Sequence, residues 1–252
     1  MKNNNKSFYS GFIKDLTGVC CKKNIGLKVI GHSTAHKIYR LMINPRAKIN
    51  FCIAAGVHGD EIAGPLAILD LLNNKKYLDR RVKYFIYPMI SPSAFDLGRR
   101  RNAAAVDLNV FGKKTLADKR YAEAKIFYED VCGRSFAAFL SLHEDLDEKR
   151  FYSYVFEKRS VPQIVYRQIV KEAGRRADIW RARSIHGAKS DRAGLIINHN
   201  DRSIEQYMFN HGGVWLSFAT ETPGKLDLAV RRRINLGTIG VLSRHMGRSA
   251  PQ

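Results

Sequence analysis

Apolar and polar positions follow two patterns along the chain, short apolar runs and helical periodicity, which together predict an α/β fold. Short apolar runs of strand character lie at residues 26–31, 37–43, 48–55, 82–88, 137–142, 193–197 and 214–220. Helical periodicity predicts helices over residues 61–73, 117–131, 161–176, 203–210 and 225–246. This order favours a mixed, mainly parallel sheet with helices on both faces, and we expect residues 1–252 to form one domain.

Between residues 89 and 116 the pattern gives way to a long irregular segment with a high density of charge. The segment contains Pro92 and Gly112. Long loops inside compact domains are more often binding loops than plain connections. We therefore expect part of the functional site in this segment.

The composition is that of a folded globular protein. With 45% hydrophobic and 26% charged residues, the 252-residue chain can bury one sizeable core. No apolar run reaches the roughly 20 residues of a membrane span, and the amino terminus lacks the apolar stretch of a signal peptide. A cytoplasmic location is expected, and the four cysteines, which show no CxxC spacing, should be reduced thiols.

The net charge of +20 favours an anionic partner. Basic residues cluster at positions 99–101, 113–114, 175–176 and 231–233. Nucleic acid, a polycarboxylate substrate and an anionic surface all fit this charge, as does a basic chain whose charge serves solubility alone. Since no nucleic-acid-binding motif is present, nucleic acid is not favoured.

Candidate metal ligands follow two of the predicted strands. The apolar run 51–57 leads into His58-Gly-Asp-Glu61, where an imidazole and a carboxylate can converge on one cation and Gly59 permits the tight backbone path. A second apolar run, AAFLSL, leads into His143. Each residue alone also fits an ordinary structural role, such as a surface histidine or a glutamate at a helix N-terminus. Together, two histidines and a carboxylate form a catalytic zinc set with an open fourth position.

Glu221 ends a third apolar strand and precedes a Pro-Gly turn. A carboxylate at the end of a buried strand loses solvation, which is unfavourable without a partner or a chemical role. Beside zinc, such a carboxylate could take a proton from the attacking water and later deliver it to the leaving amine. The alternative is a glutamate that caps the following turn.

In this order and at these separations, the three ligand candidates and Glu221 resemble the zinc metallocarboxypeptidase family. That family includes murein-peptide amidases and is related to succinylglutamate desuccinylase and aspartoacylase. The resemblance covers residues 48–225 or so. It implies a hydrolase that cleaves an amide bond by metal-activated water, with Zn²⁺ held by His58, Glu61 and His143 and with Glu221 as general base and then acid.

Residues 98–109 resemble a further family segment, which reads G-R-x-N-x-x-G-x-D-L-N-R. By that resemblance Arg100 would stabilise the oxyanion. Arg101 would bind substrate, or would take the role of Arg100 if the register slips. Asp107 would orient the first histidine ligand, and Asn109 would bind the carboxylate of the substrate.

Two positions depart from the family pattern. Val110 replaces the arginine that pairs with a terminal carboxylate, so either Lys113, Lys114 or Arg99 substitutes for it or the substrate presents no free α-carboxylate there. The capping tyrosine of carboxypeptidases has its nearest counterpart in Tyr207, which would bind substrate or simply pack on a helix face.

The sequence therefore predicts a zinc metallopeptidase or amidohydrolase that acts on a peptide or N-acyl amino acid, with an anionic substrate expected. One alternative is a deacylase of the succinylglutamate desuccinylase and aspartoacylase type, which the loss of the arginine at Val110 mildly favours. Another is a basic zinc-containing binding protein without turnover. The presence of Glu221 argues against it, because structural zinc normally has four protein ligands. Tyr152 and Tyr154 either line the cleft or belong to a strand.

Overall fold

The computed structural model describes residues 7–158 and 164–248. In this part of the chain nine strands form the main sheet, and β8 (Ser184–Ile185) and β9 (Ala188–Lys189) form a separate pair. The main sheet contains β1 (Gly26–Ser33), β2 (His36–Ile43), β3 (Ile49–Ala55), β4 (Val82–Tyr87), β5 (Ala138–Asp145), β6 (Arg150–Glu157), β7 (Asp178–Ile179), β10 (Leu195–Ile197) and β11 (Leu216–Pro223).

The strands follow the order β1-β2-β4-β3-β5-β11-β6-β10, with β7 paired to β6. The four central strands, β4, β3, β5 and β11, run parallel to one another. On one side the antiparallel pair β1 and β2 joins β4, and on the other β6 runs antiparallel to β11. The prediction of a mixed, mainly parallel sheet is confirmed.

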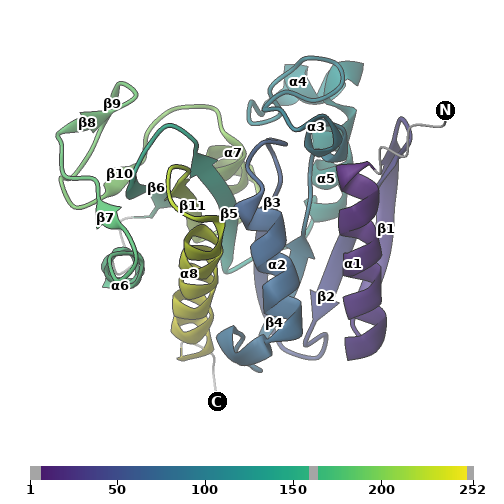
Figure 1. The fold of residues 1–252 in the computed structure, drawn as a ribbon, viewed down its shortest axis with the longest axis horizontal. Coiled ribbons are helices and arrows are strands. Elements are labelled where there is room, and N and C mark those ends of the chain that lie inside the picture. The colour runs from purple at the N-terminus through teal and green to yellow at the C-terminus, as the bar shows by residue number, and fades with distance from the viewer. Residues whose placement is uncertain (1–6, 159–163, 249–252) are drawn as a thin grey trace.

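Helices cover both faces of the sheet (Figure 1). One face carries α1 (Phe8–Lys23), α2 (Ala63–Asn73), α6 (Ile164–Ala173) and α8 (Leu228–Arg248), and the other carries α5 (Ala122–Val131) and α7 (Ile204–His211). Two short helices, α3 (Pro92–Leu97) and α4 (Lys113–Ala117), lie in the segment that the sequence presents as irregular.

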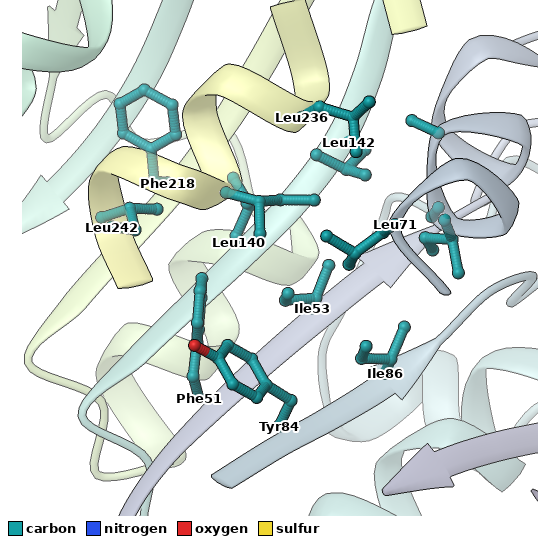
Figure 2. Packing of buried hydrophobic residues seen from close by; sticks show 14 of the residues in the cluster. Phe51, Ile53, Leu71, Tyr84, Ile86, Leu140, Leu142, Phe218, Leu236 and Leu242 are labelled. Carbon is teal, nitrogen blue, oxygen red and sulfur yellow. The ribbon is translucent and has the colours of Figure 1, made fainter. Parts of the chain in front are cut away.

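The alternation of side chains along each central strand divides the core into two layers. On β3, Phe51 and Ile53 face the layer under α2 and α8, whereas Cys52 and Ala54 face the layer under α5 and α7. Figure 2 shows the first layer, where Phe51 and Ile53 lie beside residues of β4, β5 and α8. Because both faces are covered, these strands are apolar at nearly every position.

The amino-terminal helix α1 is not predicted by the sequence pattern. Its buried stripe consists of only Phe12, Leu16 and Cys20, at i, i+4 spacing, and its other residues are mostly exposed and polar. Ser7 caps the helix by accepting a hydrogen bond from the backbone N–H of Ser10 at 3.2 Å. Such a narrow apolar stripe gives a weak periodic signal, although it suffices to dock α1 on the sheet.

The structure also contains strands that the sequence pattern does not predict, namely the eight-residue β6 and the two-residue β7, β8 and β9. The structure assigns Tyr152 and Tyr154 to β6, and the helix expected over residues 117–131 begins as a short 3₁₀ turn before α5. The four cysteines are free thiols, as predicted. Among the described residues, no helix combines the length and apolar character that crossing a membrane requires.

Candidate active site

The candidate site lies where the parallel strands β3, β5 and β11 end. In the strand register Ala55 pairs with Leu142, and His143 pairs with Glu221, so the three carboxyl ends meet at one edge. On β11, Phe218 belongs to the core layer under α8. Glu221, three residues further on, therefore points to the other face of the sheet, where α7 lies.

Three buried side chains from two strand ends bring metal-binding atoms together. The Nδ1 atom of His58 lies 2.5 Å from Oε1 of Glu61, and Nδ1 of His143 lies 2.8 Å from Oε2 of the same carboxylate. One ligand atom from each residue lies within 4.8 Å of the others. The sequence prediction that these three residues converge thus agrees with the geometry.

Each imidazole is also held from its far side by a second carboxylate. Nε2 of His58 lies 3.0 Å from Oδ1 of Asp107, and Nε2 of His143 lies 3.2 Å from Oε1 of Glu205. A histidine whose Nε2–H is donated to a carboxylate keeps Nδ1 free to bind a metal. The donor set, two imidazole nitrogens and one carboxylate with its supporting partners, fits zinc.

The charges of these groups shift one another's pKa values. Burial alone would lower the pKa of His143, but the carboxylates of Glu61 and Glu205 raise it well above its usual 6.5. The pKa of His58 is raised in the same way, against burial, by Glu61 and Asp107. Burial would raise the pKa of Glu61, but the two imidazoles lower it. A metal ion must therefore displace protons from the histidines.

Glu221 differs from the other carboxylates of the site because its side chain accepts no hydrogen bond from the described residues. Burial raises its pKa to about 8, an effect that the nearby His143 opposes and Glu61 reinforces. It makes no capping hydrogen bond to the turn after β11. A carboxylate in this setting is suited to exchanging a proton near neutral pH.

Arg100, and not Arg101, reaches the candidate metal ligands. Its Nε atom lies 2.9 Å from Oδ2 of Asp107, and Nη1 lies 3.6 Å from Oε1 of Glu61. Arg101 instead donates from Nη1 to the backbone carbonyl of Ala105 at 3.2 Å. Of the two registers that the sequence leaves open, these contacts favour the one with Arg100.

Gly59 is required at its position for a reason other than a sharp turn. A Cβ atom there would meet the backbone carbonyl carbon of Ala94 in α3 at 1.9 Å, and the N–H of Gly59 donates to the carbonyl of Arg99 at 3.0 Å. The left-handed residue that turns the chain after β3 is Gly56, with φ 62°. Close packing at Gly59 thus holds the turn that carries His58 and Glu61 against the segment that carries Arg100.

A cleft of about 610 Å³ opens over these residues. All three ligand candidates, Arg100, Asp107, Asn109, Glu205 and Glu221 line it, together with Tyr152, Tyr154, His186, Asp201 and Val110. The side-chain carbonyl of Asn109 accepts a hydrogen bond from the backbone N–H of Ile204 at 3.0 Å, so this residue also fixes the start of α7.

Tyr207 and Arg101, both predicted to bind substrate, lie outside the lining of this cleft. The ring of Tyr207 packs between Phe111, Tyr128 and His211, with centroid distances of 5.6, 5.4 and 4.4 Å. The ring faces the core layer under α5, because the side of α7 that carries Tyr207 lies against Tyr128. This packing favours the second of the two roles that the sequence leaves open for Tyr207.

Two of the three bases expected to replace the arginine missing at Val110, Arg99 and Lys114, do not line the cleft. Arg99 donates to the backbone carbonyls of Arg101 and Asn102, at 3.1 and 2.9 Å. Lys114 is exposed and outside the cleft lining. The side chain of Lys113 falls outside the described part of the structure.

Sequence reasoning missed Glu205. This residue is 2% exposed and lies on α7 between Ile204 and Met208, which are buried. A signal was present, because an acidic residue on the buried stripe of an amphipathic helix requires a partner. The identity of that partner, His143, depends on how α7 docks on the sheet.

Comparisons with known proteins agree with this geometry. Residues 47–158 match the family model of the succinylglutamate desuccinylase/aspartoacylase catalytic domain. No curated protein matches the chain in sequence. The chain is similar in structure to a "putative metallopeptidase" from Shewanella amazonensis SB2B, with 26% identity, a TM-score of 0.79, and coverage of 93% of this chain and 91% of that one.

Two further solved structures have the same fold. The "putative metallopeptidase" from Shewanella denitrificans OS217 shows 23% identity and a TM-score of 0.81, covering 93% of this chain and 88% of that one. A metallo-carboxypeptidase from Burkholderia cenocepacia shows 16% identity and a TM-score of 0.70, covering 94% and 68%. The predicted resemblance to the metallocarboxypeptidases is confirmed. Family match and fold together point to a metallocarboxypeptidase-like or desuccinylase/aspartoacylase-like hydrolase.

Proposed function

We propose that the protein is a zinc-dependent hydrolase that cleaves an amide bond in a peptide or an N-acyl amino acid. The observation that supports this most directly is the presence, in one cleft, of three converging metal-binding side chains and of a carboxylate, Glu221, that accepts no hydrogen bond from the described residues. In this proposal the whole chain, residues 1–252, forms one catalytic domain.

The metal would be held by His58, Glu61 and His143, with Asp107 and Glu205 orienting the two imidazoles. When bound, zinc supplies a Lewis acid that makes water a nucleophile near neutral pH and polarises a carbonyl. Three protein ligands leave one position for chemistry, which is the arrangement of catalytic zinc sites.

Glu221 would move the proton. Its Cα position pairs with that of His143 across β5 and β11, so its carboxylate and the imidazole ligand extend from neighbouring strand positions on one side of the sheet. From there it would accept a proton from the attacking water and deliver it to the leaving nitrogen. Within the described part of the chain no group hydrogen-bonds to its carboxylate, which leaves both oxygens available for that exchange.

Arg100 would stabilise the negative charge that develops on the carbonyl oxygen. Asp107 holds the guanidinium by its Nε atom, and about half of the arginine side chain is exposed to the cleft. A guanidinium that is already oriented costs little reorganisation during the reaction. Asn109 would contribute a substrate contact at the same wall of the cleft.

A deacylase of the desuccinylase/aspartoacylase type is the second candidate. It is favoured by the family match over residues 47–158 and by Val110, because the cleft offers no arginine there for a terminal carboxylate. In that case the acyl group of the substrate, and not a peptide, would occupy the cleft.

A hydrolysis assay separates these possibilities. The zinc-loaded protein is incubated with a free peptide, the same peptide with a blocked carboxyl terminus, and a set of N-acyl amino acids. A peptidase cleaves the peptides, whereas a deacylase releases free amino acid from the N-acyl compounds, and both activities should disappear on chelation. If the protein with one zinc per chain turns over no compound, the hydrolase proposal fails.

A zinc-containing binding protein without turnover is the remaining alternative. Its signature would be binding of nucleic acid that has a steep salt dependence and is unchanged in Glu221→Gln. Measuring such binding by fluorescence anisotropy at two salt concentrations completes the comparison.

A further inference from the structure

Two arginines of the basic cluster at residues 231–233 form ion pairs inside the protein. Both lie in the first part of α8. Nη1 of Arg231 donates to Oε2 of Glu144 on β5, and Nε of Arg232 donates to Oδ2 of Asp70 on α2 at 2.7 Å. These pairs tie α8 to β5 and to α2.

Glu144 connects the segments that carry two of the candidate metal ligands. It follows His143 on β5, and its side chain points to the same face of the sheet as Leu142, where α2 and α8 lie. Oε1 of Glu144 accepts the backbone N–H of Ala63, at the start of α2, at 2.6 Å. Glu61 lies two residues before this N–H. One carboxylate thus joins the strand of His143 to the helix that begins just after Glu61.

The first turn of α2 has no cap of its own. The residue at the N-cap position, Ile62, makes no side-chain capping hydrogen bond, and the first turn contains no acidic residue. The first four N–H groups of a helix lack partners within the helix, and a negative charge near them is favourable for the helix dipole. Glu144 supplies both an acceptor and a charge from a position 81 residues further along the chain.

The start of α2 also packs directly on the strand ends. A Cβ atom at Gly64 would meet the backbone carbonyl oxygen of Leu142 at 2.9 Å and the Cβ atom of Ala55 at 3.2 Å. Packing of this density leaves little free space to absorb a shift. A displacement of the start of α2 would therefore move Glu61 relative to His143.

The pair of Glu144 and Arg231 is buried, with 0% and 13% of the two side chains exposed. A buried ion pair contributes little net stability, because the loss of hydration offsets the attraction between the charges. An apolar pair of similar volume would fill the same space but would leave the N–H of Ala63 without this acceptor. The pair is therefore better explained by the hydrogen bond that it presents to α2 than by stability.

We propose that Glu144, held in place by Arg231, is a positioning residue of the metal site. By accepting the N–H of Ala63, it fixes the location of Glu61 relative to His143. This inference rests on the hydrolase function proposed above, in which these two ligands hold zinc. Glu144 acts through the start of α2 and not through contact with the metal.

The test replaces the buried pair and measures zinc affinity separately from stability. Glu144→Met combined with Arg231→Met should keep the fold, because apolar residues of similar volume often replace a buried ion pair without loss of stability. The double variant removes the acceptor of Ala63 and should lower zinc affinity at least about tenfold. Competition with a chelator of known affinity gives the zinc affinity, and chemical denaturation gives the free energy of unfolding.

Two further variants separate positioning from packing. Glu144→Gln keeps an oxygen for the N–H of Ala63 and should have a zinc affinity within about threefold of wild type. The matched control is the pair of Arg40 and Asp130, which is also buried, with 8% and 11% of the side chains exposed, and lies outside the lining of the cleft. Arg40→Met combined with Asp130→Met should leave zinc affinity within about twofold of wild type.

Zinc affinity within about twofold of wild type in the double variant of Glu144 and Arg231 would overturn the inference. An equal loss in the control pair would do the same, since a general effect of the substitutions would then explain it. A loss in Glu144→Gln as large as in the double variant would also contradict the proposed hydrogen bond.

The hydrolase proposal is judged separately, on the wild-type protein. If wild type binds one zinc and hydrolyses an amide while the double variant of Glu144 and Arg231 binds zinc equally well, the positioning role alone fails. If wild type binds no zinc, the hydrolase proposal fails and the positioning role fails with it.

Discussion

The two walls of the cleft are held in different ways. The strand wall consists of His58, Glu61, His143 and Glu221, which extend from the ends of three parallel strands. The outer wall consists of Tyr154, His186 and Asp201, of which only the tyrosine lies on a long strand. Buried backbone ladders and close ion pairs fix the strand wall, whereas turns and two-residue strands support most of the outer wall.

This difference separates chemistry from recognition. In the strand wall His58, Glu61 and His143 lie 2.5 to 3.2 Å from their partners, which suits a metal site that tolerates little displacement. The outer wall presents a carboxylate and aromatic rings mostly on turns and short strands. Such segments can vary without disturbing the core. Substitutions on the strand wall should therefore abolish function, and those on the outer wall should shift specificity.

The largest effect is expected from removing a ligand of the strand wall. His58→Ala and His143→Ala should each lower zinc affinity by more than about 100-fold, because two protein ligands remain where catalytic zinc has three. Metal analysis after dialysis gives the zinc content, with His32→Ala on β1 as control, since that imidazole is exposed. Stoichiometric zinc in both ligand variants would show that the metal site lies elsewhere.

Glu221→Gln should retain zinc and the fold but lose about 10² to 10⁴ in kcat. The amide nearly matches the carboxylate in size and cannot accept the proton of water. Zinc content and thermal unfolding provide the structural controls for the kinetic measurement. Near-normal turnover would assign the proton transfer to another group and would leave the strand wall with a metal-binding role alone.

Glu205→Gln should produce a smaller loss, about 10 to 100-fold in zinc affinity or kcat. The variant weakens the partner that orients His143 but leaves all three ligands present. Glu205→Asp should recover less than wild type, because the shorter carboxylate cannot reach Nε2 at the same distance. Zinc affinity equal to wild type in Glu205→Gln would restrict this residue to a packing role.

The pH dependence follows from the directions of the pKa shifts in the metal-free protein. The raised pKa values of His58 and His143 mean that their ion pairs contribute stability below about pH 6.5, and that this is lost as the pH rises through the folded-state values. The lowered pKa of Glu61 means that its contribution is present above about pH 4.5 and is lost as the pH falls.

The ion pairs of these three groups should therefore stabilise the protein without zinc most strongly between about pH 4.5 and 6.5. Zinc affinity should increase with pH, by up to about tenfold per pH unit for each proton displaced. Thermal unfolding with and without zinc at pH 5, 6, 7 and 8 measures both trends. A zinc-induced shift in Tm that stays constant over this range would show that the histidines are already neutral.

The strand wall could be predicted from the sequence because three apolar strands each end in a polar side chain. In a parallel sheet the carboxyl ends lie together, so spacing along the chain translates directly into proximity at His58, His143 and Glu221. Arg100 and Asp107 needed the family segment in addition, because an irregular loop has no periodicity that reports where its side chains point.

The outer wall could not be predicted in this way. Asp201 and His186 reach the cleft through turns whose path depends on tertiary contacts, and Glu205 finds its partner only when α7 docks. The sequence also left the role of Tyr207 open, since its nearness to a family position did not determine which side of α7 it occupies.

The smallest effect is expected for Tyr207, which belongs to neither wall. Tyr207→Phe removes the hydroxyl but keeps the ring that packs against Phe111, Tyr128 and His211. We expect kcat/KM within about twofold of wild type and a free energy of unfolding lower by no more than about 1 kcal/mol.

Tyr207→Ala also loses the packing of the ring. This variant should destabilise the protein by about 3 kcal/mol, while the folded fraction keeps its kcat/KM. Kinetics of both variants, corrected for the folded fraction from chemical denaturation, separate packing from substrate contact. A tenfold fall in kcat/KM for Tyr207→Phe at unchanged stability would show that the hydroxyl of this tyrosine contacts the substrate.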